Sequence, residues 1–404
     1  MKKLINQIIE NAIRDTNPYT TVVNELKDRQ FIGKVYVFAV GKAAADMAKG
    51  CYDALNGRQE IAAGLVVTKY GHAKEISPLF TVIESGHPVP DENSEKATEK
   101  FVEIAENITE RDTVIALVSG GASALFEKSL IDREKMQALT SKMLKSGMTI
   151  NEMNTVRKHL SVVKGGNFIQ RCNTKNILAL VLSDVIGDDL SVIGSGLTVL
   201  DKTTKEDAID ILQRYGIEPP VEISETPKNI SDVENILIGN LTILCNSAKN
   251  TAKSNGYKAK ILSTEVQGEA REIAKQLVEL AKNEAENTVL IMGGETTVTV
   301  KGKGLGGRNQ EFALAAGIEL ENVPDVTVFA FGSDGTDGPT DAAGGIADCN
   351  TAGEIYRATG KSATDFLENN DAYHALKSVD RLIITGPTGT NVNDIYVAIK
   401  KSGR

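Results

Sequence analysis

Glycine, serine and charged residues follow several short apolar runs of this sequence, at places where loops could bind an anion. Gly41-Lys42 follows KVYVFAV, and Ser119-Gly120-Gly121-Ala122-Ser123 follows TVIALV. A lysine near a helix N-terminus opposes the helix dipole unless an anion binds to both. Adjacent glycines let backbone amides approach a phosphate or carboxylate, and hydroxyls add donors. The two loops predict an anion site, with an exposed lysine and a tight structural turn as the alternatives.

Carboxylates follow two other apolar runs. Asp184 comes directly after NILALVLS, where it could bind Mg²⁺ or accept a proton. The segment GSDGTDG carries Ser333, Asp334 and Asp337 in an oxygen-rich loop that suits Mg²⁺, and its spacing does not match a calcium-binding EF-hand. We therefore predict metal ligands among Asp184, Asp334 and Asp337.

The second half of the chain has two further glycine-rich segments, Gly293-Gly294-Glu295-Thr296 and KGKGLGGRN at 301–309. Gly302, Gly304 and Gly307 formally satisfy G-x-G-x-x-G, but the acidic residue of a dinucleotide site is not found at the expected distance. A flexible loop that carries Arg308 and Asn309 into an anionic site fits the segment better.

A local basic cluster lies in NEMNTVRKHLSVVKGGN, where Arg157, Lys158 and Lys164 precede Gly165-Gly166 in a predicted helix over 151–164. In a chain of net charge −9 this cluster indicates an anion site, although a solvated basic face is an equal alternative. The histidines show no partner spacing, so we expect structural roles for all four: His72, His87, His159 and His374.

These loops need a scaffold of alternating strands and helices, and the sequence predicts one. Buried, β-branched runs at 34–40, 64–70, 113–118, 176–182, 258–264, 288–294, 326–332 and 381–386 alternate with helical patterns. The fold class is therefore α/β, with a parallel or mostly parallel sheet covered by helices on both faces. The proline-rich segment 216–232 interrupts the pattern and predicts a domain boundary.

Composition excludes several classes of protein. The 404 residues suffice for two or three domains, and a net charge of −9 disfavours binding to nucleic acids and anionic membranes. The four cysteines are widely spaced, without a zinc pattern, and are expected to be reduced. The first residues form an amphipathic helix rather than a signal peptide, and the apolar runs are too short to span a bilayer. We expect a cytoplasmic protein without a membrane partner.

Common catalytic motifs are missing, which narrows the chemistry. The sequence has no G-x-S-x-G, H-E-x-x-H or P-loop motif. Phosphoryl transfer depends mostly on positioning, cations and Mg²⁺, and the strand-end residues match that demand. The predicted substrate- and nucleotide-binding residues are Gly41, Ser119, Gly120, Gly121, Ala122, Ser123, Arg157, Lys164, Gly293, Gly294, Glu295, Thr296, Gly306, Gly307, Asn309 and Ser333.

Seven long motifs, in order from about residue 30 onward, resemble the class II glycerate kinase family, whose C-terminal part is called the MOFRL domain. They are VGKAAADMA, SGHPVPDENS, VSGGASALF, NTVRKHLSVVKGG, LSDVIGDDLSVIGSG, GGETTVTVKGKGLGGRNQEFAL and FGSDGTDGPTDAAGG. The resemblance implies an ATP- and Mg²⁺-dependent kinase that acts on D-glycerate and usually gives 2-phosphoglycerate. It also implies a Rossmann-like N-terminal domain, here 1–225, and a smaller α/β C-terminal domain, here 226–404.

The same resemblance implies that Lys42 and Arg308 are catalytic cations, and we add Asp184 as a catalytic carboxylate. Relatives have also been called hydroxypyruvate reductases, so an NAD(P)-dependent reductase is the alternative, supported only by the formal G-x-G-x-x-G. A non-catalytic protein that binds sugar acids is a third interpretation. The sequence leaves open which hydroxyl is phosphorylated and whether the chain forms a homodimer.

Overall fold

The computed structural model describes residues 1–230 and 233–402, which form two compact units. The N-terminal unit is Pro18–Ile238, and the C-terminal unit is Met1–Asn17 together with the chain from Gly239 onward. This division differs from domains 1–225 and 226–404 at both ends. The first helix buries its apolar stripe in the C-terminal unit, and the strand after the proline-rich segment extends the first sheet.

The sheet of the N-terminal unit has the strand order β3-β2-β1-β4-β5-β6. The pairs from β3 to β5 are all parallel, as predicted. The order reverses between β1 and β4, and ligands of such sheets bind beyond the carboxyl ends of the strands at this switch point. The strands are β1 (Val35–Val40), β2 (Ile61–Lys69), β3 (Phe80–Ser85), β4 (Thr113–Val118), β5 (Asn176–Leu182) and β6 (Val233–Gly239).

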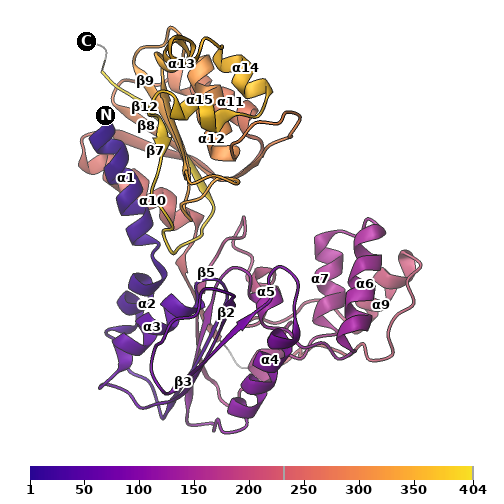
Figure 1. Ribbon diagram of the computed structural model, residues 1–404. Helices are drawn as coiled ribbons and strands as arrows, with labels where there is room; N and C mark the ends of the chain where they lie inside the picture. The colour runs from indigo at the N-terminus through magenta and orange to yellow at the C-terminus, as the bar shows by residue number, and fades with distance from the viewer. Residues whose placement is uncertain (231–232, 403–404) are drawn as a thin grey trace. The chain divides into compact units, whose positions relative to one another are not determined.

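Helices cover this sheet, and a second group of helices lies to one side of it (Figure 1). Four phenylalanines, Phe38, Phe101, Phe126 and Phe168, make edge and stacked contacts in the core between sheet and helices. The lateral group, formed by α6, α7 and α9, has its own core around Met143, Val156 and Leu212. The helices are α2 (Pro18–Leu26), α3 (Ala44–Leu55), α4 (Glu92–Ala105), α5 (Ala122–Leu125), α6 (Arg133–Lys145), α7 (Ile150–Lys158), α8 (Asn167–Arg171), η1 (Ile193–Ser195) and α9 (Lys205–Arg214).

The C-terminal unit has a mixed sheet of order β11-β10-β9-β12-β8-β7. Only the β7–β8 pair is parallel, so this sheet departs from the mostly parallel arrangement predicted for the strands. Its strands are β7 (Lys258–Glu269), β8 (Thr288–Thr297), β9 (Val326–Gly332), β10 (Gly344–Asp348), β11 (Leu382–Ile383) and β12 (Asp394–Lys400). Its helices are α1 (Lys2–Asp15), α10 (Leu241–Ser254), α11 (Ala270–Lys282), α12 (Arg308–Glu319), α13 (Thr351–Thr359), α14 (Ala363–Glu368) and α15 (Ala372–Lys377).

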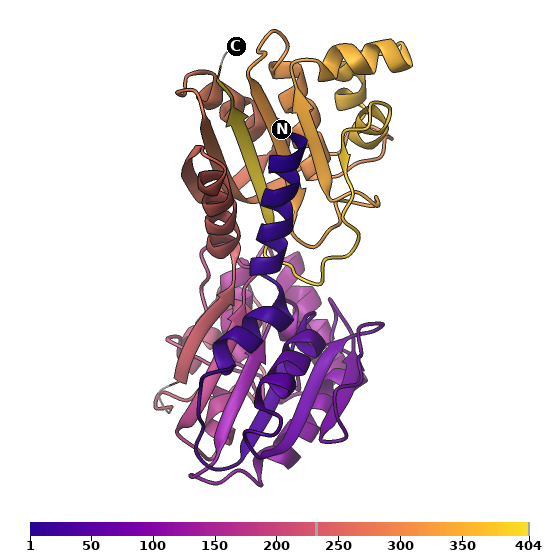
Figure 2. The same ribbon diagram turned by 90° about the vertical axis from the view of Figure 1, so that its left-hand side faces the viewer.

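Helix α1 packs against α10, and the two lie side by side in Figure 1; Figure 2 shows α1 in full from the other direction. It buries Leu4, Ile5 and Ile8, which confirms the predicted amphipathic helix. The amide of Asn11 donates to Thr251 at 3.0 Å. These contacts explain why the first seventeen residues group with the C-terminal unit.

The structure also bears on the predicted helix over 151–164, on the cysteines and on membrane spans. The predicted helix over 151–164 ends at Lys158, so Lys164 lies in the following loop. Cys51, Cys172, Cys245 and Cys349 are all free thiols. Among the described residues, none of the helices combines the length and apolar composition that a membrane span requires.

Candidate functional site

The loops after β1 and β4 meet at the switch point of the N-terminal sheet. The Lys42 amide donates to the Gly120 carbonyl at 2.9 Å, and the Ala43 amide donates to the Ser119 hydroxyl at 3.1 Å. Ser119 is buried, so its hydroxyl fastens one loop to the other and does not reach solvent. The predicted role of Ser119 as a direct donor to a ligand is therefore less suitable than a role in holding the two loops together.

Glycine is required where these loops touch. Gly41 has a φ of 126°, and a Cβ atom there would stand 2.2 Å from the Ser119 hydroxyl. Within the described chain, the amides of Gly120 and Gly121 have no hydrogen-bond acceptor. Successive unpaired amides of this kind form a cradle for an anion. The loop 119–121 thus retains the chemistry that the sequence predicted.

The side chains of Lys42 and His87 lie next to this cradle. The Cβ position of Gly121 lies 3.3 Å from Cε of Lys42 and 3.0 Å from Cδ2 of His87. The Lys42 amine has no ion-pair partner within 4.0 Å among the described residues. Burial lowers the pKa of His87, and the positive charge of Lys42 lowers it further. His87 was expected to be structural, and the structure places its imidazole beside the loop.

Arg157 approaches the same loop from helix α7. Its guanidinium donates to the Ser123 carbonyl at 3.5 Å, and no carboxylate of the described residues forms an ion pair with it. Burial lowers the pKa of Arg157, because the charge has lost water without gaining an acid. The Ser123 hydroxyl lies 2.7 Å from that of Ser195 in the turn after β5. Arg157 and Ser123, both predicted binding residues, therefore lie together at this loop.

Lys164 does not join this group. Its side chain is fully buried and forms an ion pair with Glu127, which also accepts from Ser161 at 2.9 Å. Lys158 likewise is buried and lies 3.4 Å from Asp201. The structure thus gives these two lysines internal partners, which opposes the predicted anion-binding role of Lys164.

Asp184 follows β5 and lies against the glycine loop. A Cβ atom on Gly120 would stand 2.1 Å from Oδ2 of Asp184, so only glycine allows the carboxylate to pack there. The charge of Asp184 also acts on His87, whose pKa it raises against the larger effects of burial and Lys42. The Asp184 carboxylate, the His87 imidazole and the Lys42 amine thus lie at the same edge of the sheet.

The C-terminal unit holds a separate charged cluster around Arg308, the first residue of α12. The guanidinium donates to Asp394 through Nε at 2.5 Å and Nη2 at 3.2 Å, and to Glu295 through Nη1 at 2.6 Å. Burial disfavours its charge, but Asp394 and Glu295 outweigh that effect and raise the pKa of Arg308. Arg308 is therefore permanently charged and held by two carboxylates.

A tyrosine on β12 extends this cluster. The hydroxyl of Tyr396 donates to Asp394 at 3.2 Å and accepts from the Thr296 amide at 3.1 Å. Asp394 is 1% exposed, and burial raises the pKa of its carboxyl while Arg308 opposes that rise. Sequence analysis missed Asp394 and Tyr396. The signal available was DIYVAIK, an apolar run that begins with an acid.

Asp337 caps a helix and is not placed to bind a metal. Its Oδ1 accepts from the Asn309 amide at 3.1 Å, and its Oδ2 accepts from the Gln310 amide at 2.8 Å. Both oxygens thus satisfy the N-terminus of α12. These bonds argue against the predicted metal-binding role of Asp337, and Asn309, a predicted binding residue, is buried.

Asp334 and Ser333 stabilise the loop after β9. Asp334 accepts from the Thr336 amide at 2.9 Å, and the buried Ser333 hydroxyl accepts from the Val392 amide at 2.8 Å. Ser333 therefore helps to hold this loop by accepting a backbone hydrogen bond. Within residues 1–230 and 233–402, no group of three or more His, Cys, Asp or Glu side chains converges on a metal position.

Gly293 and Gly294 lie inside β8 and not in a loop. Gly294 pairs with Val266 of β7 and with Asp394 of β12, and a Cβ atom on it would stand 2.0 Å from the Val266 carbonyl. Close strand packing therefore requires this glycine. The predicted anion loop 293–296 is corrected to a strand whose Glu295 and Thr296 contact the Arg308 cluster.

The loop before Arg308 is fastened and not free. The Gly304 amide donates to the Asn369 carbonyl at 2.9 Å, and the Leu305 amide donates to Asp371 at 2.9 Å. A Cβ atom on Gly307 would stand 2.3 Å from Cγ of Asp337. Gly302, Gly304 and Gly307 thus allow close packing against neighbouring residues, whereas a Cβ atom on Gly306 would make only ordinary contacts of 3.4 Å or more. This packing differs from the expected flexible loop.

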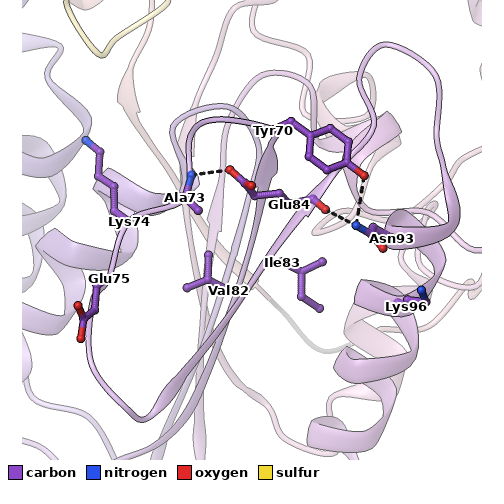
Figure 3. Close-up of a pocket in the computed structure, with 9 residues that line it drawn as sticks. All are labelled: Tyr70, Ala73, Lys74, Glu75, Val82, Ile83, Glu84, Asn93 and Lys96. Atoms are coloured by element: carbon purple, nitrogen blue, oxygen red, sulfur yellow. Dashed lines mark hydrogen bonds between the residues drawn. The ribbon is translucent and has the colours of Figure 1, made fainter.

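An open hollow of about 660 Å³ at the β3 edge of the N-terminal sheet lacks these features (Figure 3). Its polar groups are paired with one another: the Ala73 amide donates to Glu84, and the Asn93 amide donates to the Glu84 carbonyl and the Tyr70 hydroxyl. Its lysines, Lys74 and Lys96, form ion pairs with acids. We therefore place the candidate site at the switch point.

Comparison with known proteins shows the family of the chain. Residues 4–227 match a family described as a domain of unknown function, DUF4147, and residues 288–394 match the MOFRL family. The chain is 46% identical to the D-glycerate 2-kinase of Thermotoga maritima, over 99% of this chain and 98% of that protein. The crystal structure of a glycerate kinase from Thermotoga maritima superposes with a TM-score of 0.94 and covers 99% of each chain. A putative hydroxypyruvate reductase of Agrobacterium vitis is 37% identical, over 98% of this chain and 93% of that protein.

Proposed function

Because this chain belongs to the glycerate kinase family, with a DUF4147 region followed by a MOFRL region, we propose that it transfers a phosphoryl group from ATP to D-glycerate and forms 2-phosphoglycerate. The observation that carries the proposal is the arrangement at the switch point. Two unpaired amides, the Lys42 amine and the Arg157 guanidinium surround one glycine loop, and neither cation has a carboxylate partner among the described residues. Such a site attracts a highly charged anion.

Lys42 stabilises negative charge on the phosphoryl group as it moves. Its side chain lies beside the loop 119–121, where the unpaired amides of Gly120 and Gly121 are the donors we assign to phosphate oxygens. Phosphoryl transfer demands mainly positioning and cationic stabilisation, so a flexible point charge next to an amide cradle is suited to it. Asp184 is near enough to this loop to orient the glycerate hydroxyl or to accept its proton.

Arg308, which the family resemblance proposes as a catalytic cation, has its direction fixed by Asp394 within the C-terminal unit. A bidentate contact to a buried carboxylate holds the guanidinium plane, which a lysine could not reproduce. Asp394 does not touch the reacting groups in this assignment and is a positioning residue. The contact of Nη1 with the half-exposed Glu295 is the one that an incoming phosphate can replace.

Mg²⁺ bound with ATP fits Asp184 better than the other predicted ligands. Mg²⁺ in kinases is held by one or two carboxylates together with substrate phosphates, so a cluster of three acids is not required. Asp184 lies at the proposed phosphate loop, whereas both oxygens of Asp337 serve the α12 amides. When bound, the ion neutralises charge on the phosphates. Asp334 keeps one oxygen on the Thr336 amide and is the weaker second ligand.

The reductase alternative is disfavoured by the place of its only motif. A dinucleotide fingerprint needs free amides at the helix N-terminus for the pyrophosphate. Here the amides of Asn309 and Gln310 are already bound by the Asp337 carboxylate, and Gly302 and Gly304 pack against Asn369. The glycine spacing therefore has a packing explanation.

Phosphorus NMR of the purified chain with ATP, Mg²⁺ and D-glycerate tests the proposal directly. We expect ADP and a single phosphomonoester signal coupled to the C2 proton. A phosphomonoester at C3 would overturn the assignment of 2-phosphoglycerate, and nicotinamide oxidation with hydroxypyruvate in place of ADP release would favour the reductase.

A further inference from the structure

A second cavity of the N-terminal unit, about 530 Å³ in volume, adjoins the switch-point loops. It lies between the segment Pro88–Pro90, which follows β3, and helices α6 and α7. Ligand pockets of proteins commonly have about 300–1,000 Å³. The cavity is therefore large enough for a nucleoside, and its size exceeds what a three-carbon acid needs.

Five apolar residues line this cavity together with eight polar or charged ones, and its two carboxylates, Glu95 and Glu127, form ion pairs with Arg133 and Lys164. Pro88, Pro90 and Met136 line it, and Val89 and Leu144 are 60% and 64% exposed although both are large apolar residues. Exposed apolar side chains that gather around one hollow indicate a binding surface. Such walls suit the two faces of an aromatic ring and not a small polyhydroxylated anion.

Polar side chains stand at one edge of the cavity. Gln137 and Ser141 lie on α6 and are exposed, and Thr140 lies between them. An amide that presents both a donor and an acceptor can pair with the edge of a purine, as Gln and Asn do with adenine in nucleic acids. Apolar faces with an amide at the edge thus match a base.

The cavity is joined to the phosphate loop through two residues. Arg157 lines the cavity and also donates to the Ser123 carbonyl at the end of the loop 119–123. Pro88 lines it as well and directly follows His87, whose ring touches the Cβ position of Gly121. A molecule with an apolar ring in the cavity can therefore extend its anionic part past Arg157 to the unpaired amides.

We infer that this cavity binds the adenine base of ATP, with Gln137 at the edge of the base and Arg157 on the phosphate chain. The inference rests on the proposed kinase function and adds to it the place of the nucleotide. Arg157 needs an anion, the cavity offers apolar walls, and a nucleotide supplies both parts in one molecule.

Calorimetric titration with ADP and with inorganic tripolyphosphate separates the base from the phosphates. Ser141→Trp places an indole in the cavity from an exposed position. We expect it to weaken ADP binding at least about tenfold and to leave tripolyphosphate binding within about twofold, because only ADP carries a base. Gln137→Leu, which keeps the side-chain volume, is expected to weaken ADP about threefold to tenfold.

Ala138→Trp is the matched control, because Ala138 is an exposed residue of the same helix that lines a different groove. It should bind both ligands as the parent chain does. Arg157→Gln should weaken ADP and tripolyphosphate alike. Unchanged ADP binding in Ser141→Trp, or a rise in the KM for glycerate with none for ATP, overturns the cavity assignment. If the parent chain neither binds ADP nor phosphorylates glycerate, the proposed function itself fails.

Discussion

The two units of this protein surround their important cations in opposite ways. At the switch point of the N-terminal unit, Lys42 and Arg157 lie beside glycine amides, and no carboxylate among the described residues pairs with either. In the C-terminal unit, Arg308 is held by Asp394 and Glu295. An unpaired cation attracts an anion that brings its own charge, whereas a paired cation gains a fixed direction. The first region is built for binding and the second for orientation.

Removing Lys42 tests the binding half of this comparison and should have the largest effect. Lys42→Met should lower kcat/KM at least about 10³-fold, the size expected for a cation on the transferred group. Thermal stability should stay unchanged, because no ion pair is lost. Steady-state kinetics beside a thermal melt measures both. Lys96→Met removes an exposed lysine of an i,i+4 pair and serves as the control. Near-parental activity of Lys42→Met would remove Lys42 from catalysis.

Replacing Arg308 by lysine tests the orientation half. We expect Arg308→Lys to lose at least about 10²-fold in kcat, because a lysine cannot reproduce the two parallel hydrogen bonds of the guanidinium. Asp394 is buried and loses its bidentate partner, so the melting temperature should also fall.

Asp394→Asn separates positioning from stability in this cluster. It keeps the shape and leaves Arg308 in place but removes the charge that holds the guanidinium plane. We expect kcat to fall about tenfold with a smaller change in KM, when measured well below the melting temperature. If Asp394 were purely structural, Asp394→Asn would lower the melting temperature and leave kcat of the folded enzyme unchanged.

The residues proposed for the N-terminal site could be named from the sequence because their signals are local. Gly41-Lys42, the loop 119–123 and Asp184 each follow a buried parallel strand, and parallel strands end at one edge of the sheet. His87 was not assigned to the site because it follows β3, whose alternating sequence FTVIES was not predicted as a strand. The partner of Lys164 was equally hidden, since Glu127 lies far from it in the sequence.

The C-terminal cluster depends on long-range pairing, which spacing does not reveal. The β10 strand contains two glycines, and β12 begins at Asp394, next to β8 in the sheet although far from it in the chain. Placing Arg308 against Asp394 requires knowledge of that strand order. The role of Asp337 likewise depends on its position beside α12 and not on its own loop. The MOFRL resemblance was confirmed, but the sequence did not indicate Asp394 and Tyr396, which hold Arg308 in place.

The pH dependence of stability tests whether Asp337 caps α12, as the structure indicates, or binds a metal, as the sequence predicted. Burial raises the pKa of Asp337 from its ordinary 3.8 to about 6. The folded chain therefore binds this proton more tightly than the unfolded chain, and the contribution of Asp337 to stability falls as the pH rises from about 4 to about 6. Asp337→Asn removes the titration. Between pH 4.5 and 7.5 the free energy of unfolding of the variant should gain about 2 kcal/mol relative to the parent.

Denaturant unfolding at the two pH values measures that difference. The variant is expected to be less stable than the parent at pH 4.5, because asparagine offers one acceptor oxygen to a set of donors that now uses two. A difference that does not change with pH would show that Asp337 keeps an ordinary pKa in the folded chain. Mg²⁺ should stabilise both proteins equally if Asp337 is a cap and not a metal ligand.

Tyr396→Phe should have the smallest effect and the sharpest meaning. The ring stacks on Phe312 with centroids 4.5 Å apart, so phenylalanine keeps the packing and removes only the hydroxyl between Thr296 and Asp394. We expect a loss of about 1 kcal/mol in stability and a few-fold lower kcat, because Asp394 then holds Arg308 less firmly. A double-mutant cycle decides whether these groups act in series. In an Asp394→Asn background the hydroxyl has no carboxylate to orient, so Tyr396→Phe should leave kcat unchanged. Additive losses in kcat would mean that Tyr396 influences the reaction by a route other than Asp394. Only Asp394, and not Tyr396, would then remain as a residue that orients Arg308.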